Sequence, residues 1–196
     1  MIIIINGCPS AGKTSIVKEI QKRYSKPLLN LGIDRFWAMI PDQYKEYGSK
    51  AAEGYSFTKT TDSHGHPIIT VHRGSFAQHL DKTMPHAINT FAQYGHDLIV
   101  DEIFDDQTIR NYAQALQKQT VYLIGITCSI EELERREKAR ANRELGLARG
   151  HVDFVHAHQN YYDLIIDNTN LDPATCAEKI IDFIARNIDV TRSCLI

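Results

Sequence analysis

The segment GCPSAGKT, residues 7–14, combines small residues, a lysine and a hydroxyl side chain in the spacing GxxxxGKT. A tight loop of small residues can point several backbone N–H groups at one anion, and glycine permits loop torsions that a side chain would forbid. An apolar run at residues 2–6 precedes the loop, and residues 13–24 follow it with apolar side chains on one helical face. A buried strand, a loop and a helix in this order indicate a phosphate-binding P-loop. A plain glycine turn would not account for the full spacing.

The motif predicts how a nucleoside triphosphate and Mg²⁺ would be held. Loop amides and the partial positive charge of the helix amino terminus would bind the phosphates. Lys13 would reach the β- and γ-phosphates, Thr14 would place its hydroxyl on Mg²⁺, and Ser15 would contact the α-phosphate. We therefore expect ATP and Mg²⁺ as cofactors. The expected nucleotide-binding residues are Gly7, Cys8, Pro9, Ser10, Ala11, Gly12, Lys13, Thr14 and Ser15.

Two aspartates follow apolar segments that we expect to be strands. Asp34, in LGIDRFW, would lie at the carboxyl edge of the sheet, where it could accept the proton of an attacking hydroxyl. The alternative is an N-cap for a helix that starts near Arg35. Asp101, in LIVDE, would orient Mg²⁺, and the alternative is an ordinary acidic strand end. Glu102 would share that role or face the substrate.

An arginine series lies in the segment ELERREKARANRELGLARG. Arg136 and Arg140 are four residues apart and Arg143 follows, which predicts that all three lie near one helical face. Guanidinium groups can bind the oxygens of a transferring phosphoryl group or stack on adenine. Gly146 and Gly150 could let the segment close as a lid that excludes water. The alternative is a solvated helix with Glu–Arg pairs.

An alternation of strands and helices is needed to bring these residues together. Apolar segments that alternate with helical patterns predict an α/β fold with a doubly wound parallel sheet. A helical pattern at residues 75–94 contains Pro85, which would kink or divide the helix. The strands are expected at residues 2–6, 28–34, 96–102, 121–127 and 162–167.

Residues 41–74 interrupt this alternation. The segments YSFTKTT and IITVHR flank the turn HGHP and could form a hairpin. We expect one domain over residues 1–188, with residues 41–74 inserted over the acceptor site, residues 135–150 as a lid and residues 189–196 as a flexible tail. Six aromatic side chains would either line an acceptor pocket or pack the insertion onto the sheet: Phe36, Trp37, Tyr44, Tyr47, Tyr55 and Phe57.

Composition narrows the classes of function. The 196-residue chain is 43% hydrophobic and carries 22 basic and 24 acidic residues, so we expect a globular domain with no general affinity for nucleic acid or membranes. Four scattered cysteines are expected to be free thiols. Without a bilayer-length apolar run or a signal peptide, a cytoplasmic location is expected. His151, His156 and His158 lack a cysteine or acid at ligand spacing, so we expect surface or structural roles.

Four segments, IINGCPSAGKTSIV, LGIDRFWAMIP, LIVDEIF and REKARANR, occur in the order and spacing of the chloramphenicol phosphotransferase-like proteins. The chain resembles this family over roughly residues 2–185. The resemblance implies a three-layer P-loop kinase fold with a five-stranded parallel sheet of order 2-3-1-4-5. The polar, aromatic insertion and Trp37 differ from the antibiotic-modifying member. Phosphorylation by ATP is therefore implied more firmly than chloramphenicol as the acceptor.

The resemblance also implies roles for individual residues. Asp34 matches the base for a primary hydroxyl. Lys13, Arg140 and Arg143 match residues that act on the transferred phosphate, and Arg136 would be placed for adenine.

The sequence therefore predicts a kinase that moves the γ-phosphate of ATP to a hydroxyl of a small molecule, as a chloramphenicol 3-O-phosphotransferase does. A GTPase is disfavoured because no NKxD or DxxG segment follows the appropriate strands. The alternatives are a zeta-toxin-like or nucleotide-sugar kinase and, from a different class, a nucleotide-binding regulatory module without catalysis. The identity of the acceptor, the choice between ATP and GTP, and the oligomeric state are left open.

Overall fold

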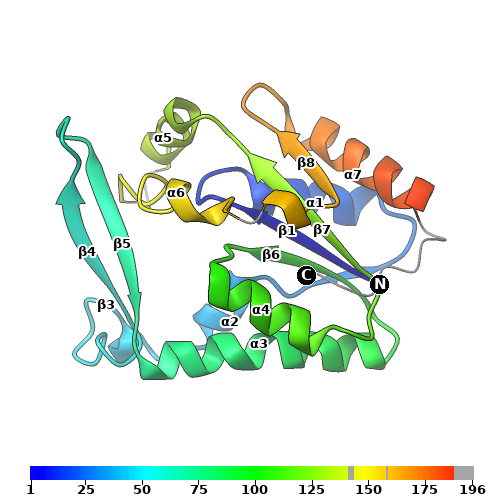
Figure 1. Ribbon diagram of the computed structural model, residues 1–196, viewed down its shortest axis with the longest axis horizontal. Helices are drawn as coiled ribbons and strands as arrows, with labels where there is room; N and C mark the ends of the chain where they lie inside the picture. Colours follow the sequence, from blue (N-terminus) through cyan, green and yellow to red (C-terminus); the bar gives the residue numbers. More distant parts are fainter. Residues whose placement is uncertain (141–143, 158, 188–196) are drawn as a thin grey trace.

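The apolar run at the amino end forms the central strand of a five-stranded parallel sheet in the computed structural model, which describes residues 1–140, 144–157 and 159–187 (Figure 1). The strands lie in the order β2-β6-β1-β7-β8, which is 2-3-1-4-5 when the five are counted along the chain. The expected α/β fold and its strand order are confirmed. The strands are β1 Ile2–Gly7, β2 Leu28–Asn30, β6 Asp97–Glu102, β7 Val121–Thr127 and β8 Leu164–Asp167.

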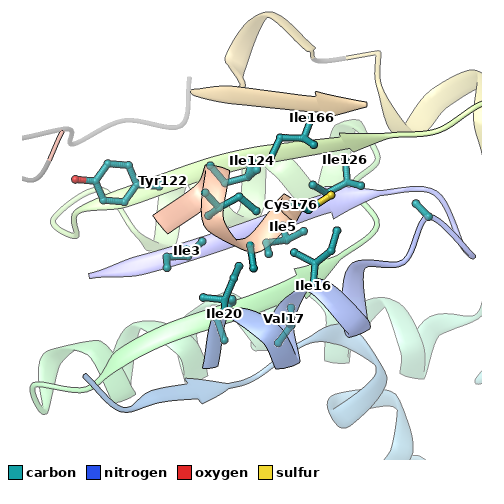
Figure 2. Packing of buried hydrophobic residues seen from close by; sticks show 14 of the residues in the cluster. Ile3, Ile5, Ile16, Val17, Ile20, Tyr122, Ile124, Ile126, Ile166 and Cys176 are labelled. Carbon is teal, nitrogen blue, oxygen red and sulfur yellow. The ribbon is translucent and has the colours of Figure 1, made fainter. Parts of the chain in front are cut away.

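One face of the sheet packs against α1 (Lys13–Arg23) and α7 (Pro173–Asn187). Alternate residues of a strand point to opposite faces, and Ile3 and Ile5 of β1 point to this one. Figure 2 shows them packed against apolar side chains of α1 and of neighbouring strands. The buried members that the two helices contribute include Ile16, Val17, Ile20, Cys176, Ile180 and Ile184.

The opposite face packs against α3 (Ser75–Gln93) and α4 (Asp106–Ala115). Ile2 and Ile4 of β1 point into this second core. Helix α3 is not divided at Pro85, because it runs as one helix to Gln93. Among the described helices, none combines the length and the apolar character that a bilayer crossing requires. The shorter helical elements are α2 Ile33–Ala38, η1 Asp42–Tyr44, α5 Ile130–Lys138, α6 Val152–Val155 and η2 Gln159–Tyr161.

Residues 41–74 contain the expected hairpin. Strands β4 (Tyr55–Thr61) and β5 (Pro67–Arg73) pair antiparallel, and the two-residue strand β3 (Lys45–Glu46) pairs with β4. Figure 1 shows this small sheet standing beyond the carboxyl ends of the main strands. The insertion therefore lies on the side of the sheet where the P-loop is.

The arginine-rich segment does not form one continuous helix. Helix α5 ends at Lys138, so Arg140 lies beyond it, and the expected single helical face with Arg136 is wrong. Glu137 gives the physical reason. Its fully buried carboxylate accepts hydrogen bonds from the N–H groups of Gly146 at 3.1 Å and Ala148 at 2.6 Å, which turns the chain back.

The hairpin is tied to the turns that follow α5. Arg149 pairs with Asp62 at 3.1 Å, and the Ile69 N–H donates to the carbonyl oxygen of Gly146 at 2.9 Å. A Cβ on Gly146, whose φ is +103°, would lie 2.5 Å from the carbonyl oxygen of Pro67. Glycine is therefore required where the two backbones meet.

The α7 face of the core should be sensitive to lost volume. Ile180→Ala removes a fully buried side chain, and the remaining cavity should lower the free energy of unfolding by about 2–5 kcal/mol. Ile165→Ala, on edge strand β8 with 46% of the residue exposed, should cost clearly less. Denaturant titration followed by circular dichroism measures both. Equal losses would contradict the packing described for this face.

Candidate active site

The loop between β1 and α1 curls back on itself around the side chain of Lys13. Ser10 and Gly12 adopt left-handed backbone angles, with φ of +64° and +86°. The Lys13 ammonium is buried and donates to the carbonyl oxygens of Gly7 at 2.8 Å and Cys8 at 3.0 Å. A tight loop with a cation at its centre is the form that phosphate binding needs.

The loop also has hydrogen-bonding capacity that a ligand could satisfy. Ser10 Oγ is buried and has no partner, the one such side-chain atom among the described residues. The first N–H groups of α1, those of Lys13 and Thr14, have no acceptor within a helix. Pro9, Ser10 and Gly12 line a cavity in front of the loop. The loop therefore fits a polyphosphate.

The register of the sheet brings Asp101 to the loop, because Ile5 of β1 pairs with Asp101 of β6. Thr14 donates its hydroxyl to Asp101 Oδ2 at 2.8 Å, and Lys13 Nζ lies 3.7 Å from Oδ1. Mg²⁺ commonly takes one or two protein oxygens together with phosphate oxygens. The residue pair Thr14 and Asp101 therefore fits Mg²⁺ bound beside a nucleotide. No cluster of three or more histidine, cysteine or acidic residues that could hold a metal occurs in the described parts of the chain.

Glu102 takes neither of the two roles considered for it. Its side chain is fully buried, accepts the Tyr112 hydroxyl at 2.7 Å and accepts the Ile103 N–H at 2.9 Å. Burial raises the pKa of Glu102 to about 7. The carboxylate points into the core beneath α4, because strand alternation turns it away from Asp101.

A cavity of about 200 Å³ joins the P-loop to Asp34. Asp34 lies in the first turn of α2, whose N-cap position is Gly32, so the alternative of a cap for a helix near Arg35 is wrong. Arg140 lines the same cavity, and Arg143 lies outside the described residues. The cavity is lined by Pro9, Ser10, Gly12, Lys13, Thr14, Ile33, Asp34, Trp37, Tyr55, Phe57, Val71, Arg73, Asp101, Ile103, Arg140, Leu147 and His151.

Arg136 contacts the outside of the P-loop and does not line this cavity. Its guanidinium donates to the carbonyl oxygen of Asn168 at 2.9 Å, to Asn168 Oδ1 at 3.2 Å and to Glu132 at 2.7 Å. Asn168 is buried and donates in turn to the carbonyl oxygen of Ala11. Arg136 and Asn168 therefore hold the loop against the end of β8. Sequence reasoning missed Asn168, although its place directly after a predicted strand was a signal.

Aromatic side chains from α2 and the hairpin form one wall of the cavity. Trp37 and Tyr55 stack with ring centroids 4.6 Å apart, and Phe57 lies 5.8 Å from Tyr55. The Arg73 guanidinium, which sequence reasoning missed, lies 5.9 Å from the centroid of the Trp37 ring. The other three aromatic residues of the predicted set do not line this cavity: Phe36 packs in the core, Tyr44 lies beside Phe76, and Tyr47 is exposed.

His151 lies buried on the wall of the same cavity, which sequence reasoning did not foresee. Its Nδ1 lies 2.7 Å from the carbonyl oxygen of Leu147. Burial lowers the pKa of His151 to about 4, so the imidazole is neutral at pH 7. His156 contacts the Tyr162 hydroxyl at 2.9 Å, and His158 lies outside the described residues.

Residues 1–185 match the family model described as Chloramphenicol phosphotransferase-like protein. The chain belongs to this family. Two proteins from strains of Mycobacterium tuberculosis are each 28% identical to it over 169 residues. Each bears the name "Putative O-phosphotransferase". The match spans 86% of this chain and 75% of each relative. The chain is accordingly an enzyme, a phosphotransferase of the kinase type.

Solved structures confirm the kinase fold of this family member. A sugar kinase from Janibacter sp. HTCC2649 superimposes with a TM-score of 0.65 at 14% identity, over 94% of both chains. The APS kinase of Mycobacterium tuberculosis, solved with AMPPNP and APS, superimposes with a TM-score of 0.61 at 13% identity, over 94% of this chain and 96% of that one.

Asn168 should be needed for the shape of the P-loop. Asn168→Ala removes one donor to the carbonyl oxygen of Ala11, which then keeps only the Arg136 guanidinium at 3.4 Å, and this should cost about 1–3 kcal/mol of stability and weaken Mg·ATP binding several-fold. Asn170→Ala, two residues along at an exposed position, is the matched control. Calorimetric titration and thermal melting measure the two effects. Equal affinities in the two variants would contradict the role of Asn168.

His151 should make stability depend on pH. Its pKa is about 4 in the folded chain and about 6.5 when unfolded, so the unfolded chain binds more protons between these values. Stability should therefore fall as the pH is lowered from about 6.5 to about 4, by roughly 2–3 kcal/mol more in wild type than in His151→Gln. Denaturant titrations at several pH values measure the difference. Parallel curves for the two proteins would contradict a buried, neutral histidine.

Proposed function

We propose that this enzyme transfers the γ-phosphate of ATP, with Mg²⁺, to a hydroxyl group of a small molecule. One observation carries the proposal: a single cavity joins Lys13 and Asp101 to Asp34 and the aromatic wall. Direct phosphoryl transfer requires a donor site and an acceptor site that meet in one place. A nucleotide-binding module without catalysis would have no need of an acceptor wall facing the phosphate loop.

Different residues of the cavity bind the phosphates, hold Mg²⁺, accept the proton and stabilise the transferring group. The loop amides and Lys13 bind the phosphates, while Thr14 and Asp101 would hold Mg²⁺, which neutralises phosphate charge when bound. Asp34 accepts the proton of the acceptor hydroxyl as its oxygen bonds to the γ-phosphorus and the bond from that phosphorus to the bridging oxygen of ADP breaks. Lys13 and Arg140 stabilise the charge on the equatorial oxygens.

The acceptor in this proposal is a small hydroxylated molecule with an apolar face. Trp37 and Tyr55 present a stacked aromatic surface beside Asp34, and Ile33 and Phe57 extend it. Planar or ring-shaped groups pack well on such surfaces. Chloramphenicol, after which the family is named, is the first acceptor to test, because its ring would pack there.

We further propose that residues 1–188 work as one domain in which residues 41–74 cover the acceptor and residues 135–150 act as a lid. Val71 of the hairpin and Leu147 of the following turns both line the cavity, which supports this division. The contacts that tie the hairpin to those turns would make them close together over the acceptor.

Asp34→Asn should separate binding from chemistry. The variant keeps the loop and should bind Mg·ATP as wild type does, but without a proton acceptor its kcat should fall at least about 100-fold. Asp42→Asn, a fully exposed carboxylate eight residues along, is the control and should keep full turnover. Acceptor-dependent ADP release, with chloramphenicol and a panel of small alcohols, measures the rate.

Two results would overturn the proposal in different ways. Near-normal turnover by Asp34→Asn would remove Asp34 as the base. Tight Mg·ATP binding by wild type, with no ADP release on any acceptor, would instead favour the non-catalytic module.

A further inference from the structure

A second cavity, of about 680 Å³, adjoins the one that holds Asp34. It lies between β5, α3, α4 and the chain around α6. Val71, Arg73 and His151 line both cavities, so the two lie on either side of these three side chains. The proposed phosphotransfer chemistry uses none of the groups that line the second cavity alone.

Arg73 is held by two carboxylates at the boundary between the two cavities. Its Nη1 lies 2.9 Å from Asp105 Oδ2 and 3.4 Å from Asp81 Oδ2. Asp81 is buried and also accepts the Trp37 indole N–H at 3.1 Å. The boundary is therefore built from an ion-pair network that links β5, α2, α3 and the start of α4. The one guanidinium faces two carboxylates, so this network offers no free positive charge to an anionic ligand at this point.

Among the side chains that line the second cavity alone, Gln78, Gln107 and Asn111 carry neutral amide groups. Gln107 donates to Asn111 Oδ1 at 2.9 Å, and Gln78 donates to the carbonyl oxygen of Arg73 at 2.8 Å. The amide oxygen of Gln107 and the NH₂ group of Asn111 are then left as an acceptor and a donor for a ligand. The single lysine on this lining, Lys82, is solvent-exposed, as are Gln78 and Gln107. Hydroxyl groups, which both donate and accept, match these amide groups better than anionic groups do.

One side of the second cavity offers an apolar surface. The rings of His151 and Phe154 lie 5.2 Å apart, and both line the cavity. The C–H face of a sugar ring packs on such a surface while its hydroxyl groups bind amide side chains.

We propose that the second cavity is a binding subsite for the uncharged, hydroxyl-rich end of the acceptor, such as a sugar ring. This proposal rests on the proposed function, because it extends the acceptor site of that reaction. The acceptor is then a two-part molecule. Its phosphorylated hydroxyl and apolar part lie between Asp34 and Trp37, and its polar part lies beyond Arg73 against Gln107 and Asn111.

The test compares two probes that differ only in whether they carry a hydroxyl-rich part. 4-(Hydroxymethyl)phenyl β-D-glucopyranoside and 4-methoxybenzyl alcohol, which share the aromatic ring and the benzylic hydroxyl, are titrated into the full chain in the presence of Mg²⁺ and a non-transferable ATP analogue, and binding is followed by ligand-detected NMR. Wild type should bind the glucoside at least about fivefold more tightly, the effect of one or two added hydrogen bonds. Asn111→Ala and Gln107→Ala should each reduce this preference severalfold.

A matched pair elsewhere serves as the control. Gln119 donates to Asn89 Oδ1 at 2.9 Å in the same Gln–Asn arrangement, and neither residue lines the second cavity. Asn89→Ala should therefore keep the wild-type preference. No preference in wild type, absence of binding by the glucoside, or an equal effect of Asn111→Ala and Asn89→Ala would each overturn the subsite.

Release of ADP is measured separately, so the two proposals can fail independently. If the enzyme phosphorylates some alcohol but does not bind the glucoside more tightly, only the subsite proposal is wrong. If tighter binding of the glucoside depends on Asn111 but no ADP is released, the subsite proposal stands and the phosphotransfer proposal is wrong.

Discussion

A buried lysine charge is the constraint around which this site is built. Lys13 is only 7% exposed, and its ammonium has two backbone carbonyl oxygens at hydrogen-bond distance and the carboxylate of Asp101 at 3.7 Å. A cation removed from water is costly unless it is well compensated, and it attracts any anion that can reach it. Three features keep this charge in place: the loop torsions, the central position of β1 and the pairing of Ile5 with Asp101.

Two hydrogen-bonded networks position the walls around that charge. Behind the P-loop, Arg136 and Asn168 bind backbone groups and fix the loop to the end of β8. On the acceptor side, Asp81 joins Trp37 to Arg73 and so connects the helix that carries Asp34 to the hairpin. Preorganised groups cost little reorganisation when charge develops during a reaction. Both networks act through other residues and stand outside the proposed chemistry.

Sequence reasoning succeeded where a function depends on a short run of residues. The P-loop needs a fixed spacing along the chain, and β6 ends in an acid, so the loop and Asp101 could be recognised from the sequence alone. It failed where a role depends on packing between distant segments. Arg73 meets an aspartate 32 residues away, and the end of α5 before Arg140 depends on Glu137 binding backbone nine residues later. Neither contact leaves a local pattern in the sequence.

The prediction of the sheet order came from family resemblance, because the alternation of strands and helices alone allows several strand orders.

Replacement of the buried lysine tests the central claim most directly. Lys13→Met keeps the apolar stem and removes the charge, with Lys22→Met on the exposed face of α1 as the control. If the charge is kept for a polyphosphate, Lys13→Met should bind Mg·ATP at least about tenfold more weakly in calorimetric titration at a temperature where the variant is fully folded, because loss of the contacts to Gly7, Cys8 and Asp101 should also lower its stability. Unchanged affinity for Mg·ATP in Lys13→Met would contradict the account.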